Sequence, residues 1–96
     1  MNNNRRKEIS KIIEEVESAV STAKEKLEEL KTSIESVRDE EQEYMDNMPE
    51  NLQGSERYGV AEQAVDNLDS AASSIDEIIE AMDTDDLIDY LNDAAE

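Results

Sequence analysis

Carboxylates are the side chains that could do chemistry in this chain, because it has 27 Asp and Glu residues but no His and no Cys. The commonest general base, the commonest metal ligand and any thiolate metal ligand are therefore missing. The segment from Asp83 to Asp86 lacks the glycine and the terminal glutamate of an EF-hand loop, and carboxylate bundles that hold two metals use a Glu-x-x-His motif. No nucleophile paired with a base and no glycine-rich phosphate loop is present. We predict a protein that is not an enzyme, with no metal and no cofactor.

Charge is distributed very unevenly along the chain. Residues 1–38 contain eight basic and eight acidic residues, whereas residues 39–96 contain nineteen acidic residues and a single basic one, Arg57. The formal net charge of −18 therefore belongs to the second part. Such a surface attracts basic partners and repels nucleic acid and anionic membranes. We expect a basic protein surface as the partner, with no direct binding of nucleic acid or membrane.

The acidic residues that follow position 38 form the first candidate binding surface. Its predicted members are Asp39, Glu40, Glu43, Asp46, Glu62, Asp66, Asp69, Asp76 and Glu77. One interpretation is a solvated face that keeps the protein soluble. The other is a decoy that imitates the phosphate spacing of a nucleic acid and occupies a basic groove. Solubility needs far fewer charges, and dense like charge destabilises a fold through self-repulsion.

A basic cluster near the start is the second candidate surface. Arg5, Arg6, Lys7 and Lys11 lie in the first turns of a predicted helix, where the helix dipole disfavours cations. These side chains either pair with the acidic C-terminal end of the chain or bind a small anion together with the free helical N–H groups. The second possibility predicts a site for a nucleotide-like ligand.

The third candidate lies beside the only proline of the chain. Tyr44, Arg57 and Tyr58 flank a predicted turn together with several apolar residues. They either close a small satellite core or form a hot spot for a partner, since Tyr and Arg are enriched in hot spots.

The elements that must position these residues begin with one long helix, predicted over residues 5–47. Apolar residues recur there in alternating steps of four and three, the 3.5-residue period of a coiled-coil seam. The expected seam consists of Ile9, Ile13, Val16, Val20, Ala23, Leu27, Leu30, Ile34, Val37, Glu41, Tyr44 and Met48. Asn3 or Asn4 is the predicted N-cap.

A turn over residues 48–55 separates this helix from the second one. Pro49 ends the first helix, Gly54 is expected to ease the turn, and Ser55 is a good N-cap. The second helix is predicted over residues 56–82. Its apolar stripe loses phase after Met82, and Thr84 is expected to cap a short third helix over residues 84–95.

The returning segment is about as long as the first helix, so we predict one all-α domain over residues 1–96, folded as an antiparallel, coiled-coil-like helical hairpin. A turn near residue 51 places Leu27 opposite Ile75 and Ile9 opposite Ala94. The basic start of the chain then lies beside its acidic end, at Asp89, Asp93 and Glu96.

Two helices bury little apolar surface, and the apolar stripe widens toward the open end of the hairpin. Ile12 and Ala19 add a column to the first helix, and Ile79, Leu87 and Ile88 widen the second arm. A contact between two helices covers only a narrow seam. We expect two hairpins to associate into a four-helix-bundle homodimer at this end.

The segment from Glu50 to Tyr58 (ENLQGSERY), after a long helix that opens NNNRRKEISKIIEE, resembles small acidic helical proteins of phages and prophages of low-GC Gram-positive bacteria. This resemblance implies a phage-like origin and a role against a host system. It transfers no functional residue to this chain.

Three functions are compatible with these patterns. The preferred one is a phage-type binding protein that sequesters a basic, nucleic-acid-binding host protein and so inhibits a host defence system. The alternatives are a sponge for a small anionic nucleotide-like ligand and a structural coiled-coil adaptor. No run of seven or more apolar residues occurs, so we expect no signal peptide, no membrane span and a cytoplasmic location in the host bacterium.

Overall fold

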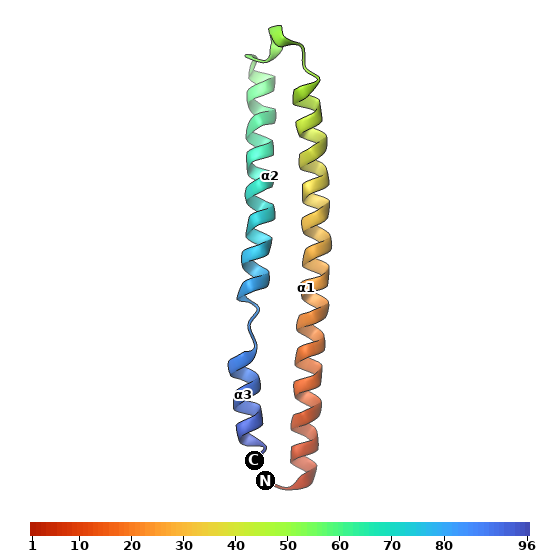
Figure 1. Ribbon diagram of the computed structural model, residues 1–96, viewed down its shortest axis with the longest axis vertical. Helices are drawn as coiled ribbons and strands as arrows, with labels where there is room; N and C mark the ends of the chain where they lie inside the picture. Colours follow the sequence, from red (N-terminus) through yellow and green to blue (C-terminus); the bar gives the residue numbers. More distant parts are fainter.

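The computed structural model describes residues 1–96 as an extended antiparallel helical hairpin without strands, which confirms the predicted all-α hairpin of a single chain (Figure 1). Helix α1 (Asn3–Asp46) forms one arm, and α2 (Glu56–Ala81) and α3 (Asp85–Ala94) form the other. A short 3-10 helix, η1 (Glu50–Leu52), lies in the connection at the tip. The hairpin measures 76 × 17 × 12 Å, and both chain termini lie at its open end. None of its helices combines the length and the apolar character that crossing a bilayer requires.

Asparagine caps α1, but one position earlier than the sequence suggested. The Asn2 backbone is extended, and its Oδ1 accepts a hydrogen bond from the Arg5 N–H at 2.9 Å. The prediction of Asn3 or Asn4 as the cap was wrong, because both residues already lie inside the helix. A cap must have a non-helical backbone for its side chain to reach the free N–H groups of the first turn.

The tip connects α1 to α2 without any residue of positive φ. A Cβ placed on Gly54 would meet no atom within 4 Å, so the turn does not depend on glycine at this position. Ser55 is the N-cap of α2, as predicted, and its Oγ accepts a hydrogen bond from the Tyr58 N–H at 3.3 Å.

Removing the Ser55 cap is expected to lower the stability of the protein modestly. Ser55→Ala is expected to lower the free energy of unfolding by about 1 kcal/mol, because one N–H of the first turn of α2 loses its acceptor. Thermal or urea unfolding followed by circular dichroism measures the change. Ser36→Ala is the matched control, since Ser36 is exposed within α1. Equal stability of the two variants would show that the cap contributes nothing.

The second arm is interrupted at Met82–Thr84, so α2 and α3 are separate helices. The prediction of Thr84 as the cap of α3 was wrong in one respect, because its side chain makes no capping hydrogen bond. Asp83 takes this role instead, and its Oδ1 accepts a hydrogen bond from the Asp85 N–H at 2.9 Å. Thr84 has φ −110° and ψ 8°, which is not the extended backbone of a good N-cap.

The break also changes the register between the arms. Near the middle of the hairpin, Lys31 contacts Asp76, so four residues back along α1 Leu27 lies level with about Glu80. The expected pairing of Leu27 with Ile75 is therefore displaced by about one helical turn. At the open end, Arg6 contacts Ala95, close to the expected register. The non-helical break at Met82–Thr84 lies between these two contacts, where the rise per residue departs from the value of about 1.5 Å in a helix.

One of the two predicted seam columns faces α2 along the whole of α1, and the other does so only over the first part. Ile9, Ile13, Val16, Val20 and Leu27 are half-buried, as expected. Beyond them, Ile34, Glu41 and Met48 also remain half-buried or buried, as expected. The other column shifts by one residue, to Lys31, Arg38 and Met45. A straight α-helix drifts about 20° per heptad against a 3.5-residue repeat, so a seam column rotates out of the contact. Leu30, Val37 and Tyr44 consequently lie exposed, at 43%, 52% and 44%.

Only five residues are buried, and all belong to the half of the hairpin nearest the tip. They are Met45, Met48, Ala61, Val65 and Ala72. Small side chains at positions 61 and 72 let the two arms approach closely. The open half of the hairpin has no fully buried residue, so this chain forms an unusually small core for its length.

Candidate binding surfaces

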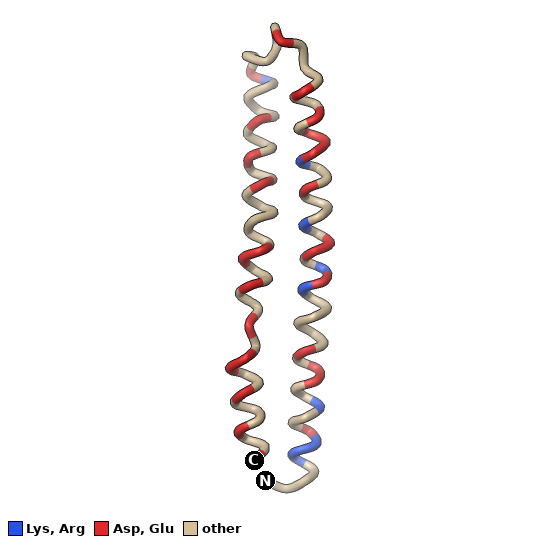
Figure 2. The backbone as a smooth tube through the Cα atoms, viewed as in Figure 1, with Lys and Arg blue, Asp and Glu red and all other residues tan.

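Acidic residues line both arms of the hairpin, whereas basic residues are almost confined to α1 (Figure 2). Ion pairs within 4 Å involve only five of the 27 carboxylates, at Glu29, Glu35, Asp39, Asp69 and Asp76. The remaining carboxylates have no basic side chain within 4 Å. The hairpin therefore carries most of its negative charge without internal neutralisation.

Two ion pairs connect the arms and mark one flat side of the hairpin, which we call the ion-pair face. Lys31 Nζ lies 3.0 Å from Asp76 Oδ2, and Arg38 Nη1 lies 2.8 Å from Asp69 Oδ1. Arg38 also contacts Asp39 at 3.0 Å. The hydrogen bond to Asp76 raises the pKa of Lys31 above its ordinary value of 10.5, and the hydrogen bond to Asp69 raises the pKa of Arg38. The stability that the Lys31 pair contributes is therefore lost at the alkaline end as the pH rises through the raised pKa of Lys31.

These pairs divide the predicted acidic residues into two groups. Asp39, Asp69 and Asp76 are engaged by Arg38 and Lys31 within the chain. The others, all exposed and without an ion pair, are Glu40, Glu43, Asp46, Glu62, Asp66 and Glu77.

Most of these six unpaired carboxylates lie on the same side of the hairpin. Successive helical residues are 100° apart, so Glu62 and Asp66 project toward the ion-pair face on α2, and Glu43 and Asp46 lie on the outer side of α1 next to it. Glu40 is rotated away from these residues. We use the name acidic surface for Glu43, Asp46, Glu62, Asp66 and Glu77.

Unpaired like charges predict a response to salt. Added salt is expected to raise the melting temperature, because it screens the repulsion among carboxylates more than it weakens the two ion pairs between the arms. Thermal unfolding between about 0.02 and 0.5 M NaCl measures the effect. A melting temperature that falls steadily with salt would show that the attractive pairs outweigh the repulsion.

The basic start of the chain contacts the acidic end, but through the main chain. Arg6 Nε donates to the Ala95 carbonyl oxygen at 2.8 Å, and Arg6 Nη2 donates to the main-chain oxygen of Glu96 at 3.3 Å. The expected ion pairs with the carboxylates of Asp89, Asp93 and Glu96 do not form. The last carbonyls of a helix lack partners inside the helix and carry the negative end of its dipole, so they attract a cation.

The other basic side chains at this end form no hydrogen bond or ion pair. Lys7 and Lys11 line a shallow hollow of about 390 Å³ on α1, together with Arg6, whose guanidinium already binds the C-terminal carbonyls. Arg5 makes no side-chain hydrogen bond or ion pair. The predicted anion-binding residues are therefore adjacent along α1, without a second element to enclose a ligand.

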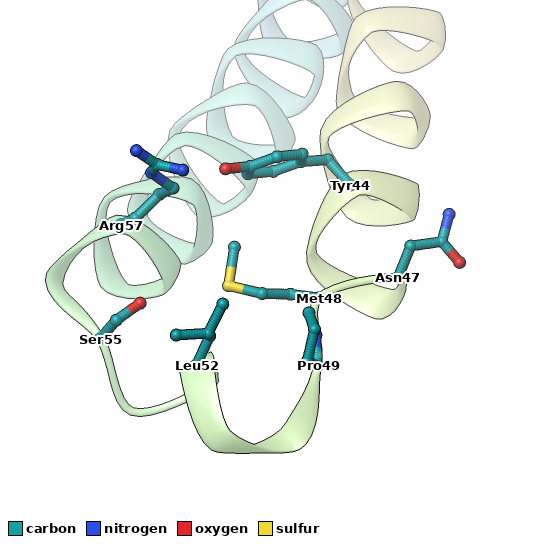
Figure 3. Close-up of a pocket in the computed structure, with 7 residues that line it drawn as sticks. All are labelled: Tyr44, Asn47, Met48, Pro49, Leu52, Ser55 and Arg57. Atoms are coloured by element: carbon teal, nitrogen blue, oxygen red, sulfur yellow. The ribbon is translucent and has the colours of Figure 1, made fainter.

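A cavity of about 600 Å³ opens at the hairpin tip (Figure 3). Its lining consists of Tyr44, Asn47, Met48, Pro49, Leu52, Ser55 and Arg57. Tyr44 reaches across from α1 toward Arg57 of α2, and the Met48 side chain lies beneath its ring. Arg57 has no ion-pair partner although it lies in the acidic part of the chain.

The three residues predicted for the tip divide between two roles. Tyr44 and Arg57 line the cavity, whereas Tyr58 packs against Met45, Ala61 and Val65 in the core. Sequence reasoning missed Asn47, because a lone amide after an acidic helix end carries no pattern. The cavity has an apolar floor and one cation at its rim, and no group of carboxylates anywhere in the structure is arranged to hold a metal ion.

Comparison with protein-family models, curated proteins and solved structures finds no match to this chain.

Proposed function

We propose that this chain is a non-enzymatic, phage-type binding protein that occupies a basic, nucleic-acid-binding surface of a host protein. In this role it would inhibit a host defence system, acting as a four-helix-bundle homodimer. The observation that carries the proposal is the lack of neutralisation, since the chain has 27 acidic and nine basic residues and only five carboxylates have a basic side chain within 4 Å. A fold that tolerates this repulsion keeps its negative potential available for a basic partner.

The shape of the hairpin supports the same interpretation. A rod of 76 × 17 × 12 Å presents its charge along a line, as a nucleic acid does, and does not concentrate it in one cleft. Long-range attraction between such a rod and a basic groove speeds association and excludes acidic competitors. The resemblance of the Glu50–Tyr58 segment to phage proteins suggests that this groove belongs to a host protein.

Capture of host proteins followed by competition tests the proposal. The full chain is immobilised, incubated with lysate of a low-GC Gram-positive bacterium, and eluted first with duplex DNA and then with high salt. We expect basic proteins in the DNA eluate, identified by mass spectrometry, because the decoy and the DNA compete for one groove.

Other outcomes would contradict the decoy. Captured proteins that DNA does not displace would favour the adaptor. Failure to capture any protein, together with thermal stabilisation by nucleotides that Lys7→Gln and Lys11→Gln abolish, would favour the anion sponge.

A further inference from the structure

Exposed apolar side chains gather on the side of the hairpin opposite the ion-pair face. Outside the tip and the first residue, the large apolar side chains that are exposed are Ile12, Leu30, Val37, Tyr44, Val60, Ile78, Leu87 and Tyr90. Ile12, Leu30, Val37, Tyr44, Val60 and Ile78 fall on this one side, which we call the apolar face.

The ion pairs fix the position of this face on α1. Leu30 and Val37 directly precede Lys31 and Arg38, which point to the ion-pair face. One residue back along a helix is a rotation of about 100°, so Leu30 and Val37 lie on the opposite flank. Tyr44 continues the same column seven residues later.

Helical spacing also fixes the position of the apolar face on the second arm. Ile78 follows Asp76 by two residues, a rotation of about 200° away from the ion-pair face. Val60 lies eighteen residues earlier, which is five full turns, so it shares the flank of Ile78. Tyr44 and Val60 also line one surface hollow, which shows directly that the exposed flanks of the two arms belong to a single face.

The hairpin as a whole leaves more surface exposed than a compact protein of its mass. The hairpin exposes 7157 Å² of surface, whereas a compact protein of 10.8 kDa exposes about 5,500 Å². The excess is about 1,600 Å², and a stable dimer needs about 800 Å² from each partner. The face runs from Ile12 near the open end to Tyr44 and Val60 near the tip, so most of the 76 Å length is available.

We infer that a second copy of this chain packs side by side on the apolar face, along most of the length of the hairpin. This inference deepens the homodimer of the proposed function and moves its contact away from the open end alone. It buries Val37 and Ile78, which are 52% and 51% exposed in one chain, between four helices. Both ion-pair faces and both acidic surfaces then point outward, on opposite sides of the dimer.

The charge spacing that a decoy of DNA needs also favours this arrangement. A single chain of net charge −18 along 76 Å carries about one charge per 4 Å. Two chains side by side carry about one charge per 2 Å, close to the ~1.7 Å per charge of duplex DNA. Association end to end would leave the spacing of a single chain. Side-by-side pairing therefore gives the decoy the charge density of the ligand that it imitates.

Small-angle X-ray scattering with light scattering tests the inference on the full chain. At micromolar concentration we expect twice the 10.8 kDa mass of one chain and a maximum dimension that stays near the 76 Å of the hairpin. A helical particle of 10.8 kDa would overturn the inference. So would a dimer of roughly double length, which would indicate contact through the open ends. Neither result depends on the identity of the partner, so the dimer and the decoy can fail separately.

Paired variants locate the contact. Val37→Glu with Ile78→Glu places two charges on the apolar face and is expected to weaken association at least a hundredfold, leaving a helical 10.8 kDa species at micromolar concentration. Ser21→Glu with Ser73→Glu adds the same charge at exposed positions toward the ion-pair face and should leave the dimer intact. If both double variants dissociate equally, general repulsion and not the apolar face controls assembly, and the inference is wrong.

Discussion

Val65→Asp is expected to unfold the half of the hairpin nearest the tip. Val65 is 8% exposed and packs with Met45 and Ala61 in the main cluster of the core. A carboxylate there loses its hydration, and every basic side chain nearby already contacts an acid or lies at the surface. We expect a loss of about 3 kcal/mol or more, which is a large part of the stability of a small domain.

Urea unfolding followed by circular dichroism measures this loss. Gln63→Asp is the matched control, since it places the same side chain two residues away at an exposed position of α2. Its effect should stay within about 0.5 kcal/mol. Similar destabilisation by both variants would show that the core at the tip does not hold the arms together.

Replacing four carboxylates of the acidic surface by amides is expected to weaken partner binding about a hundredfold. The variant combines Glu43→Gln, Glu62→Gln, Asp66→Asn and Glu77→Gln, which keep side-chain size. A hundredfold loss corresponds to about 0.7 kcal/mol per carboxylate, within the range of exposed ion pairs. None of these four takes part in an internal ion pair, so the helical circular dichroism signal should persist.

The choice of these residues depends on the structure. Asp69 and Asp76 are equally acidic in the sequence, but each forms an ion pair between the arms, so replacing them would confuse stability with binding. Arg5→Gln with Lys7→Gln is the control variant, since neither side chain forms a hydrogen bond or an ion pair within the chain. If this control loses binding and the amide variant keeps it, the basic start of the chain is the working surface.

Local signals in the sequence predicted the helices well, because each depends on neighbouring residues. The 3.5-residue period marked the long first helix, Pro49 marked its end, and Ser55 marked the next start. Equal arm lengths then left an antiparallel hairpin as the natural closure. The N-cap of α1 was misplaced by one residue, because Asn2, Asn3 and Asn4 are chemically identical and only backbone geometry distinguishes them.

The side-chain environment along the seam was harder to predict. A heptad pattern names the residues that face a partner only if the helices supercoil around each other. The arms of the hairpin are nearly straight, so Leu30 and Val37 turn outward and Lys31 and Arg38 turn inward to meet acids of α2. The sequence therefore predicted unpartnered apolar side chains at the open end, whereas the structure shows exposed apolar side chains along the whole hairpin.

The distribution of charge among the candidate residues also required three dimensions. Sequence reasoning grouped nine carboxylates by proximity along the chain. Whether a carboxylate is free depends on the register between the arms, which assigned Asp69 to Arg38 and Asp76 to Lys31. That register is displaced by about one turn from the expected one, since the break at Met82–Thr84 could be located in the sequence but its length along the axis could not.

The dependence of partner affinity on salt tests the central claim most directly. Once a captured partner is purified, its dissociation constant for the full chain is measured at about 50 and 200 mM NaCl. If unpaired carboxylates carry the binding, affinity should fall at least tenfold across this range, and the amide variant should show a clearly smaller fall. An affinity that is the same at both salt concentrations would contradict the account, because binding would then rest on contacts other than charge.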